Sequence, residues 1–185
     1  MAVEKVETLI IGGGQAGLAV SRHLGKLGRE HLLVERKRIA ERWRAERWDS
    51  LVANGPAWHD RFPDLDFKCD GSAFASRDEI VQYLEDYAKL NNSPVRTGVE
   101  VTALHRNADG TFRAETAQGV IEARNVVAAT GAFQKPLRPV MVPESEGILQ
   151  LHSAHYRNPD QLPPGAERAI GIAVEGRHLD AGADR

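Results

Sequence analysis

Three glycines near the start of the chain have the spacing with which proteins hold the phosphates of a dinucleotide. Gly12, Gly14 and Gly17 form a G-x-G-x-x-G pattern directly after the apolar run Thr8 to Ile11. The first glycine of such a pattern permits a tight turn, the second lets a pyrophosphate approach the main chain, and the third lets a helix pack closely on the strand. The pattern predicts a phosphate site where a buried strand passes into a helix.

An acidic residue completes this pattern. Glu35 ends the next apolar run, Leu32 to Val34, and lies eighteen residues after Gly17, near the position of the carboxylate that accepts a ribose hydroxyl in such proteins. We assign Gln15 and Ala16 to the same site, because the first N–H groups of the helix and the positive end of its dipole face the phosphates. The alternative is a glycine-rich turn formed only for packing, with Glu35 as a solvated strand end.

Two helices are predicted from apolar spacing and from start signals. In the first, the residues expected to face the sheet recur at helical spacing, and they are Ala16, Val20, Leu24 and Leu27. The second starts at the signal Ser76-Arg77-Asp78-Glu79 and ends near Asn91. Between the two lies a long irregular region, about Arg36 to Ala75, and a loop of this length inside a domain is usually functional.

Alternating and wholly apolar segments predict the remaining strands. The stretch Val95 to Arg106 is predicted as strand, and turns at Asn107–Gly110 and Gln118–Gly119 suggest a three-stranded meander. Its strands are expected at Val99–Arg106, Thr111–Thr116 and Val120–Ala123. The short apolar run Val126 to Ala129 is typical of a separate strand that returns to a buried parallel sheet. The predicted fold class is α/β, a Rossmann-like nucleotide-binding fold with a parallel sheet and a β-meander.

Composition narrows the class of protein. The chain has 185 residues, a net charge of −2 and a sequence pI of about 6.4, which argues against broad electrostatic binding of nucleic acid or membrane. The single cysteine, Cys69, excludes an intramolecular disulfide framework.

His152 and His155 lack the neighbouring ligands of a metal site, so no metal is expected. With no apolar stretch long enough to cross a bilayer and no room for a leader before the first strand, we expect a soluble cytoplasmic protein.

Five segments, in this order, carry a resemblance to a known family. They are IIGGGQAG, RWRAERWDSL, LVANGPAWHDRFPD, VVAATGAFQKP and LHSAHYRNP. Over about residues 6–166 the chain resembles the N-terminal FAD-binding part of flavin-containing monooxygenases and their bacterial flavoprotein relatives. The glycine fingerprint alone is shared by many nucleotide enzymes, whereas the ordered set is more specific.

The resemblance implies an activity and cofactors. In that family FAD is reduced by NADPH and transfers one oxygen atom, through a C4a-hydroperoxyflavin, to a small-molecule substrate. By its motif, Asn54 matches the family asparagine whose amide lies near the reacting edge of the flavin, where an amide can donate and accept hydrogen bonds without titrating. The alternative for Asn54 is a turn residue, because Asn-Gly is a strong turn dipeptide.

The same resemblance implies further cofactor contacts, each with a structural alternative. Arg36 would neutralise phosphate or lie over the adenine, or else is a surface arginine. Trp43 and Trp48 would wall the cofactor cleft, or else pack in the core. Val101 would contact adenine through its main chain, or else is an ordinary strand valine. Where the returning strand ends there are two more expected flavin contacts that could equally form a strand-terminating turn, namely Thr130 and Gly131.

The chain also departs from the family pattern. Ala40-Glu41 replaces the usual Gly-Gly before Trp43, which predicts crowding of a main-chain contact to FAD. After Ala166 no second G-x-G-x-x-G for NADPH follows. We therefore expect a shortened family member with an FAD-binding domain over residues 1–166 and a tail over 167–185, and an exposed interface that favours a homodimer or a complementing chain.

Two functions from different classes remain at this point. The first is the FAD portion of an NADPH-dependent flavoprotein monooxygenase. The second is a non-catalytic module that binds FAD or another adenine dinucleotide. A simple NAD-dependent dehydrogenase is a weaker third, since the meander and the Ala-Thr-Gly segment argue against it.

Overall fold

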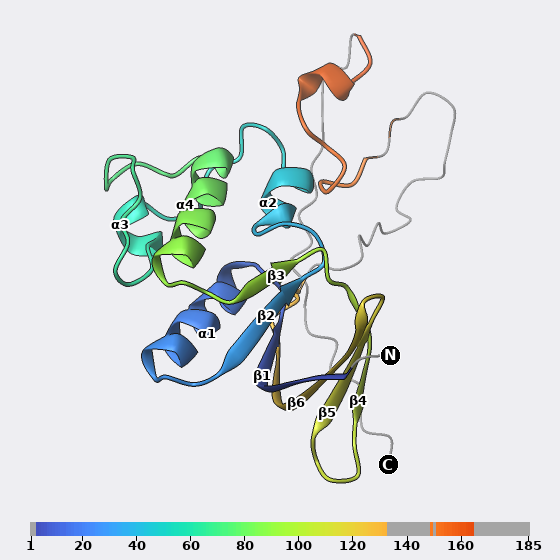
Figure 1. Ribbon diagram of the computed structural model, residues 1–185. Coiled ribbons are helices and arrows are strands. Elements are labelled where there is room, and N and C mark those ends of the chain that lie inside the picture. The colour runs from blue at the N-terminus through green and yellow to red at the C-terminus, as the bar shows by residue number, and fades with distance from the viewer. Residues whose placement is uncertain (1–2, 133–148, 150, 165–185) are drawn as a thin grey trace, which may run out of the picture.

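The N-terminal βαβ unit forms as the sequence predicts. In this computed structural model, which describes residues 3–132, 149 and 151–164, strand β1 (Val3–Ile11) leads into helix α1 (Gln15–Lys26) and strand β2 (His31–Glu35). Strands β1 and β2 pair in parallel, with Ile10 opposite Leu33. The parallel pairing puts the ends of both strands at one edge of the sheet, beside the start of α1 (Figure 1).

All six strands belong to one sheet with the order β3-β2-β1-β6-β5-β4. The pairings among β1, β2, β3 and β6 are parallel, and β4, β5 and β6 form an antiparallel meander. The predicted fold class is therefore confirmed. The remaining elements are α2 (Glu41–Ala45), α3 (Ala57–Asp60), α4 (Arg77–Leu90), β3 (Val95–Thr97), β4 (Val101–Arg106), β5 (Phe112–Thr116), β6 (Gly119–Ala128) and the short 3-10 helix η1 (Pro159–Gln161).

Two strand predictions are wrong in their boundaries. The stretch Val95 to Arg106 is not one strand, because Gly98 has a φ of +72° and turns the chain between β3 and β4. Conversely, the two strands expected at Val120–Ala123 and Val126–Ala129 are a single strand, β6, that passes through the polar residues between them. The side chain of one of these, Asn125, is exposed, so a polar residue interrupts the apolar pattern without ending the strand.

One face of the sheet is covered by α1 and α4. Ile10 and Leu33 pack there against Leu18 of α1 and against α4, and Figure 1 shows these helices on the same side of the strands. The predicted sheet-facing side of α1 is partly wrong. Val20 and Leu24 do pack against this cluster, but Ala16 is exposed and Leu27 is 73% exposed, while the residues buried beneath the helix are Gly17, Leu18 and Ser21.

The start of α4 is fixed by its own side chains, as predicted. The Ser76 hydroxyl accepts from the Glu79 N–H, and the Glu79 carboxylate accepts from the Ser76 N–H at 2.8 Å. This capping box satisfies donors that the first turn of a helix leaves open. The helix thereby holds Tyr87 and Leu84 in the core.

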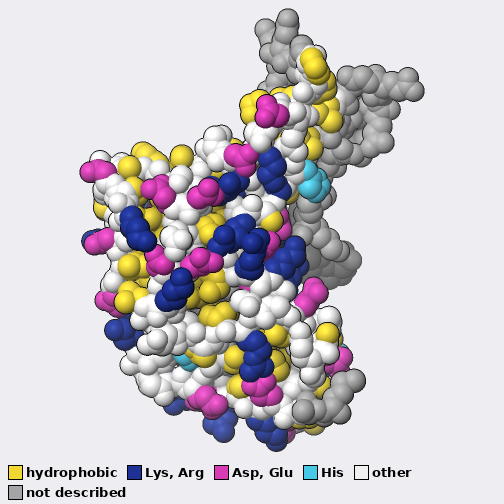
Figure 2. Space-filling view, turned by 45° about the horizontal axis from the view of Figure 1, so that its top comes forward, with side chains coloured by type: hydrophobic (Ala, Val, Ile, Leu, Met, Phe, Trp, Pro, Cys, Tyr) yellow, Lys and Arg dark blue, Asp and Glu magenta, His cyan; other side chains and the backbone are white. Residues whose placement is uncertain are grey.

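The other face of the sheet has a second apolar cluster. Leu9, Leu32 and Val34 pack there with Ala114 of β5 and Ile121 of β6. Strands β1 and β2 are thus buried on both faces, which explains their continuous apolar runs. The face of the molecule in Figure 2 has acidic and basic side chains interspersed.

Candidate functional site

The turn between β1 and α1 is held by main-chain contacts that leave no room for side chains. The Gly12 N–H donates to the Val34 carbonyl at 2.8 Å, and Gly12 has a φ of +114°. A Cβ on Gly12 would overlap the carbonyl of Ala129, and one on Gly17 would overlap the carbonyl of Gly12. The strand, the turn and the helix therefore lie too close together for a side chain at Gly12 or Gly17.

Gly14, unlike Gly12 and Gly17, has open space around it. It caps α1 with extended backbone, and a Cβ placed on it would meet no atom within 4 Å. No side chain caps this helix within the described residues, and its first turn has no acidic residue. Gln15 and Ala16 are both exposed beside it. The start of α1 thus presents open space, unpaired N–H groups and the positive end of the helix dipole together, which suits a phosphate.

The carboxylate of Glu35 is part of the turn itself. Its Oε2 accepts from the Gly13 N–H at 2.7 Å, and its Oε1 accepts from the Lys37 N–H at 2.9 Å. A Cβ on Gly13 would stand only 3.0 Å from that of Glu35. The sequence interpretation missed Gly13. The signal for it was the run of three consecutive glycines, because the fingerprint itself does not need the middle one.

The end of β6 lies directly against the glycine turn. The Ala129 N–H donates to the Ile11 carbonyl at 2.9 Å, and a Cβ on Gly12 would lie 3.3 Å from the Cα of Thr130. Gly131 follows with a φ of +80°. Both Thr130 and Gly131 are exposed, so these two predicted residues lie next to the fingerprint, at the same edge of the sheet.

The segment before α2 also reaches the turn. The Ala40 N–H donates to the Gly13 carbonyl at 3.2 Å, and Ala40 is buried in the left-handed conformation, with a φ of +58°. A glycine adopts this conformation without strain, so the Gly-Gly of the resembled family would fit this turn. The methyl group of Ala40 packs in the core cluster, away from solvent.

The two predicted tryptophans differ in their surroundings. Trp43, in α2, packs against the core cluster around Leu18 and Tyr87, and the guanidinium carbon of Arg47 lies 5.8 Å from the centre of its ring. Trp48 follows α2 and is partly buried. Packing against the core cluster is therefore sufficient to explain a tryptophan at position 43.

Asn54 lies in an exposed bend that precedes α3. The segment containing it runs antiparallel to the approach to α4, with the Ala53 N–H donating to the Ala75 carbonyl at 2.7 Å. The next residue, Gly55, donates its N–H to the Asp60 carboxylate at 3.2 Å. The Asn54 side chain is exposed and forms no hydrogen bond within the described part of the chain.

Arg36 and Val101 flank the Glu35 end of β2. Arg36 is exposed. Val101 begins β4, is partly buried against the second core cluster, and follows Val99, whose N–H donates to the Glu35 carbonyl at 2.9 Å. The start of β4 is thus tied to the residue that was predicted to hold the ribose.

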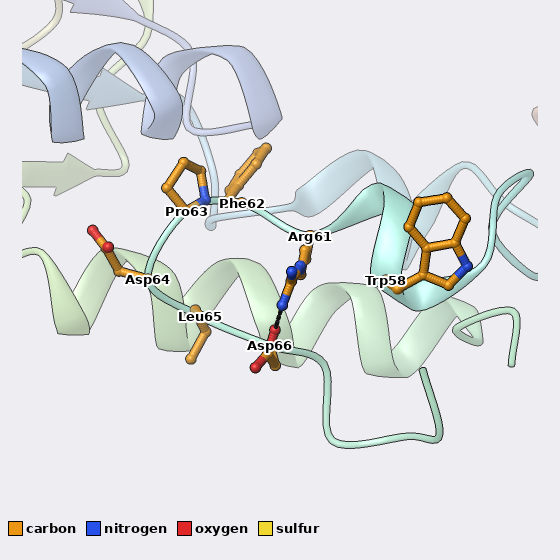
Figure 3. A pocket seen from close by; sticks show the side chains of 7 residues that line it. All are labelled: Trp58, Arg61, Phe62, Pro63, Asp64, Leu65 and Asp66. Atoms are coloured by element: carbon orange, nitrogen blue, oxygen red, sulfur yellow. Dashed lines mark hydrogen bonds and ion pairs between the residues drawn. The ribbon is translucent and has the colours of Figure 1, made fainter. Parts of the chain in front are cut away.

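A surface pocket lies apart from these residues. It has a volume of about 590 Å³ and is formed by the loop that follows α3 (Figure 3), with the lining residues Trp58, Arg61, Phe62, Pro63, Asp64, Leu65 and Asp66. Its charges are paired, Arg61 with Asp66 across the hollow and Asp64 with Arg22 of α1. None of the predicted cofactor residues lines this pocket.

Among the described residues, every helix is too short or too polar to span a bilayer. Within the same residues no three His, Cys, Asp or Glu side chains are grouped as metal ligands would be, and the rings of His152 and His155 lie 6.2 Å apart, centre to centre.

Comparisons with known proteins cover most of the chain. A family model described as pyridine nucleotide-disulphide oxidoreductase matches residues 9–170. A CzcO-like oxidoreductase of Geobacillus kaustophilus is 36% identical over 176 residues, which are 94% of this chain and 50% of that protein. Indole-3-pyruvate monooxygenase YUCCA1 of Oryza sativa is 28% identical over 179 residues, covering 92% of this chain and 43% of the relative. The chain spans about half the length of the curated relatives it matches.

Solved structures agree with these relatives. A flavin-containing monooxygenase from Stenotrophomonas maltophilia matches with a TM-score of 0.75 at 28% identity, over 84% of this chain and 48% of that one. The similarity thus extends from the order of the motifs to the arrangement of the strands and helices.

Proposed function

The chain belongs to the pyridine nucleotide-disulphide oxidoreductase family, and we propose that it binds FAD at the glycine turn as the FAD-binding part of an FAD-dependent oxidoreductase. One observation carries the proposal: the open, uncapped start of α1 at Gly14 lies beside the carboxylate of Glu35. The N–H groups there would hold the pyrophosphate. Glu35 would accept a hydrogen bond from the ribose, because a carboxylate has lone pairs beyond the two that Gly13 and Lys37 use.

The finer proposal is a monooxygenase that uses NADPH. The relatives named above include flavin and indole-3-pyruvate monooxygenases. Bound FAD supplies the electron transfer and the oxygen chemistry, and the protein positions it and excludes water. Asn54 is the proposed catalytic residue, on the strength of its motif and its exposed side chain. Residues 1–166 are the proposed FAD-binding domain. The tail proposed for residues 167–185 lies outside the described residues.

A second candidate is an FAD-binding module that does not itself use NADPH. Within these 185 residues the glycines 12, 14 and 17 form one G-x-G-x-x-G pattern, which suffices for a single dinucleotide. The visible spectrum of the purified protein separates the two candidates. Yellow protein that NADPH bleaches and air reoxidises supports the monooxygenase, whereas yellow protein that does not respond to NADPH supports the module.

FAD affinity of two glycine variants tests the site itself. Gly14→Val fills the open space at the turn and should weaken FAD binding by at least about tenfold, about 1.4 kcal/mol, with little change in Tm because nothing crowds its Cβ. Gly25→Ala is the control, since a Cβ there would touch only the His31 ring, at 3.9 Å, and should leave affinity unchanged. Equal affinity of Gly14→Val and wild type would refute the site.

A further inference from the structure

Helix α2 and the residues directly after it contain three arginines, and one of them has no acidic partner within the described residues. Arg42 of α2 forms an ion pair with Glu46, with 2.8 Å between Nε and Oε2. Its Nη1 lies 3.7 Å from the point where a Cβ on Gly131 would stand. Arg47 follows α2, and within the described part of the chain its guanidinium donates to one group, the main-chain oxygen of Glu46, at 3.3 Å. Arg42 is thus the arginine beside Gly131, and Arg47 is the one without an acidic partner among the described residues.

The surroundings of Arg47 make an unpaired charge costly. Its guanidinium stands over the Trp43 ring, and burial, followed by the positive charge of Arg42, lowers the pKa of Arg47 from its ordinary value, against the opposite effect of Glu46. An arginine stays charged at neutral pH even so. Holding such a charge partly out of water costs free energy unless an anion accompanies it.

The carboxylates nearest to Arg47 along the chain are already engaged. Glu46 pairs with Arg42, and Asp49 pairs with Arg77, with 2.6 Å between Oδ1 and Nη1. A further positive charge arrives with Arg157, whose Nη1 donates to the main-chain oxygen of Arg47 at 3.4 Å. Positive charge therefore exceeds negative charge around Arg47.

We propose that Arg47, with Arg42, forms an anion site that takes a phosphoryl group of a nucleotide. Arg42 adjoins Gly131, and the preceding residue, Thr130, adjoins Gly12 of the glycine turn, so the site continues the phosphate-binding edge of the sheet. Guanidinium groups suit this role because their planar donors match phosphate oxygens. The inference rests on the proposed function, and two sources have the same chemistry: FAD itself, or a pyridine nucleotide bound beside it.

The first experiment measures the Tm of the full chain without nucleotide, in inorganic phosphate and in chloride at equal ionic strength. Phosphate should raise the Tm of the wild type and of the control Arg44→Gln, which removes a charge paired with Glu85. It should not raise the Tm of Arg47→Gln. In chloride, Arg47→Gln should be at least as stable as wild type, because it removes an unpaired charge. A lower Tm in chloride, with stabilisation by phosphate intact, would make Arg47 a packing residue and overturn the proposal.

The second experiment identifies the source of the phosphoryl group. FAD affinity, and NADP⁺ affinity of the FAD-loaded protein, are compared among wild type, Arg44→Gln, Arg47→Gln and the charge-retaining Arg47→Lys, which also serves if Arg47→Gln does not fold. A loss of about tenfold or more confined to FAD assigns the site to FAD, and one confined to NADP⁺ assigns it to the pyridine nucleotide. Arg47→Lys should lose less than Arg47→Gln. If neither nucleotide binds Arg47→Gln more weakly than Arg44→Gln, the nucleotide assignment is wrong. If wild type binds no FAD at all, the proposed function fails, while the phosphate experiment still decides the anion site.

Discussion

The glycine turn and the arginine segment, residues 42–47, are the two parts of the proposed phosphate site, but they are built in opposite ways. The turn works because side chains are missing: a Cβ on Gly12 or Gly17 would overlap main-chain atoms. The arginine segment, from Arg42 to Arg47, works through side-chain charge, with two ion pairs, Arg42 with Glu46 and Arg44 with Glu85, and one guanidinium, that of Arg47, with no acidic partner among the described residues. The first is a steric device and the second an electrostatic one.

This difference governs how each region responds to change. The stability of the glycine turn should not depend on salt concentration. An added methyl group should destabilise the turn, because protein interiors are close-packed. An electrostatic site tolerates conservative changes of shape but weakens as salt screens its charges. Substitutions in the two regions should therefore give different patterns of lost stability and lost affinity.

The largest effect is expected from Gly17→Ala. The added Cβ would overlap the Gly12 carbonyl, so the helix must move off the turn at a cost of about 3 kcal/mol. Thermal unfolding would show a large fall in Tm, together with loss of FAD binding. Gly14→Ala is the matched control, since its Cβ meets nothing, and it should unfold like wild type. Equal Tm values for the two variants would contradict the steric account.

A smaller loss is expected from Glu35→Gln. The carboxylate accepts from two main-chain donors, Gly13 and Lys37, whereas an amide has one oxygen and turns its NH₂ toward the other donor. We expect about 2 kcal/mol less stability in urea unfolding without FAD. Glu4→Gln is the comparison, because it breaks only the exposed ion pair with Arg96 and should cost about 1 kcal/mol at most. Similar losses would mean that Glu35 does not fasten the turn.

The smallest effect on stability is expected at Asp49, which follows the arginine segment and pairs with Arg77. This effect depends on pH. Hydrogen bonds from Asn158 and then Arg77 hold the pKa of Asp49 below its ordinary value. A lowered pKa in the folded state stabilises the protein above the unfolded pKa of about 3.9, and this stability is lost as pH falls through the folded value. Asp49→Asn should therefore lower Tm at pH 7 and lose less on acidification.

The measurement for Asp49 is the Tm of both proteins from pH 7 down to pH 3. The two curves should converge as the pH falls. Parallel curves would show that Asp49 is not coupled to Arg77 and Asn158 in solution.

Much of the fold was predictable because local chemistry specified it. The Ser76 and Glu79 signal gave the start of α4, since both capping hydrogen bonds form. The strand boundaries were not predictable from periodicity. Alternation continues through Gly98, although the left-handed turn there sends β3 and β4 to opposite edges of the sheet.

The site was predictable to a different degree in its two halves. Gly12, Gly17 and Glu35 do lie together as their spacing indicated, because main-chain geometry follows directly from glycine positions. The roles of individual side chains remain predictions, Asn54 among them. That Arg47 has no acidic partner among the described residues had no sequence signal, since it depends on the ion pair between Arg42 and Glu46.

The pairing of β1 with β6 has a consequence for how fast the chain can fold. Thr8 lies opposite Asn125 in this pairing, a separation of 117 residues along the chain. Strand β1 thus waits for β6, the last described strand, before the centre of the sheet can close. Contacts so distant in sequence carry a high loop-closure entropy, so folding should be slow compared with a helical bundle of equal length, and during synthesis the early strand needs protection from wrong partners.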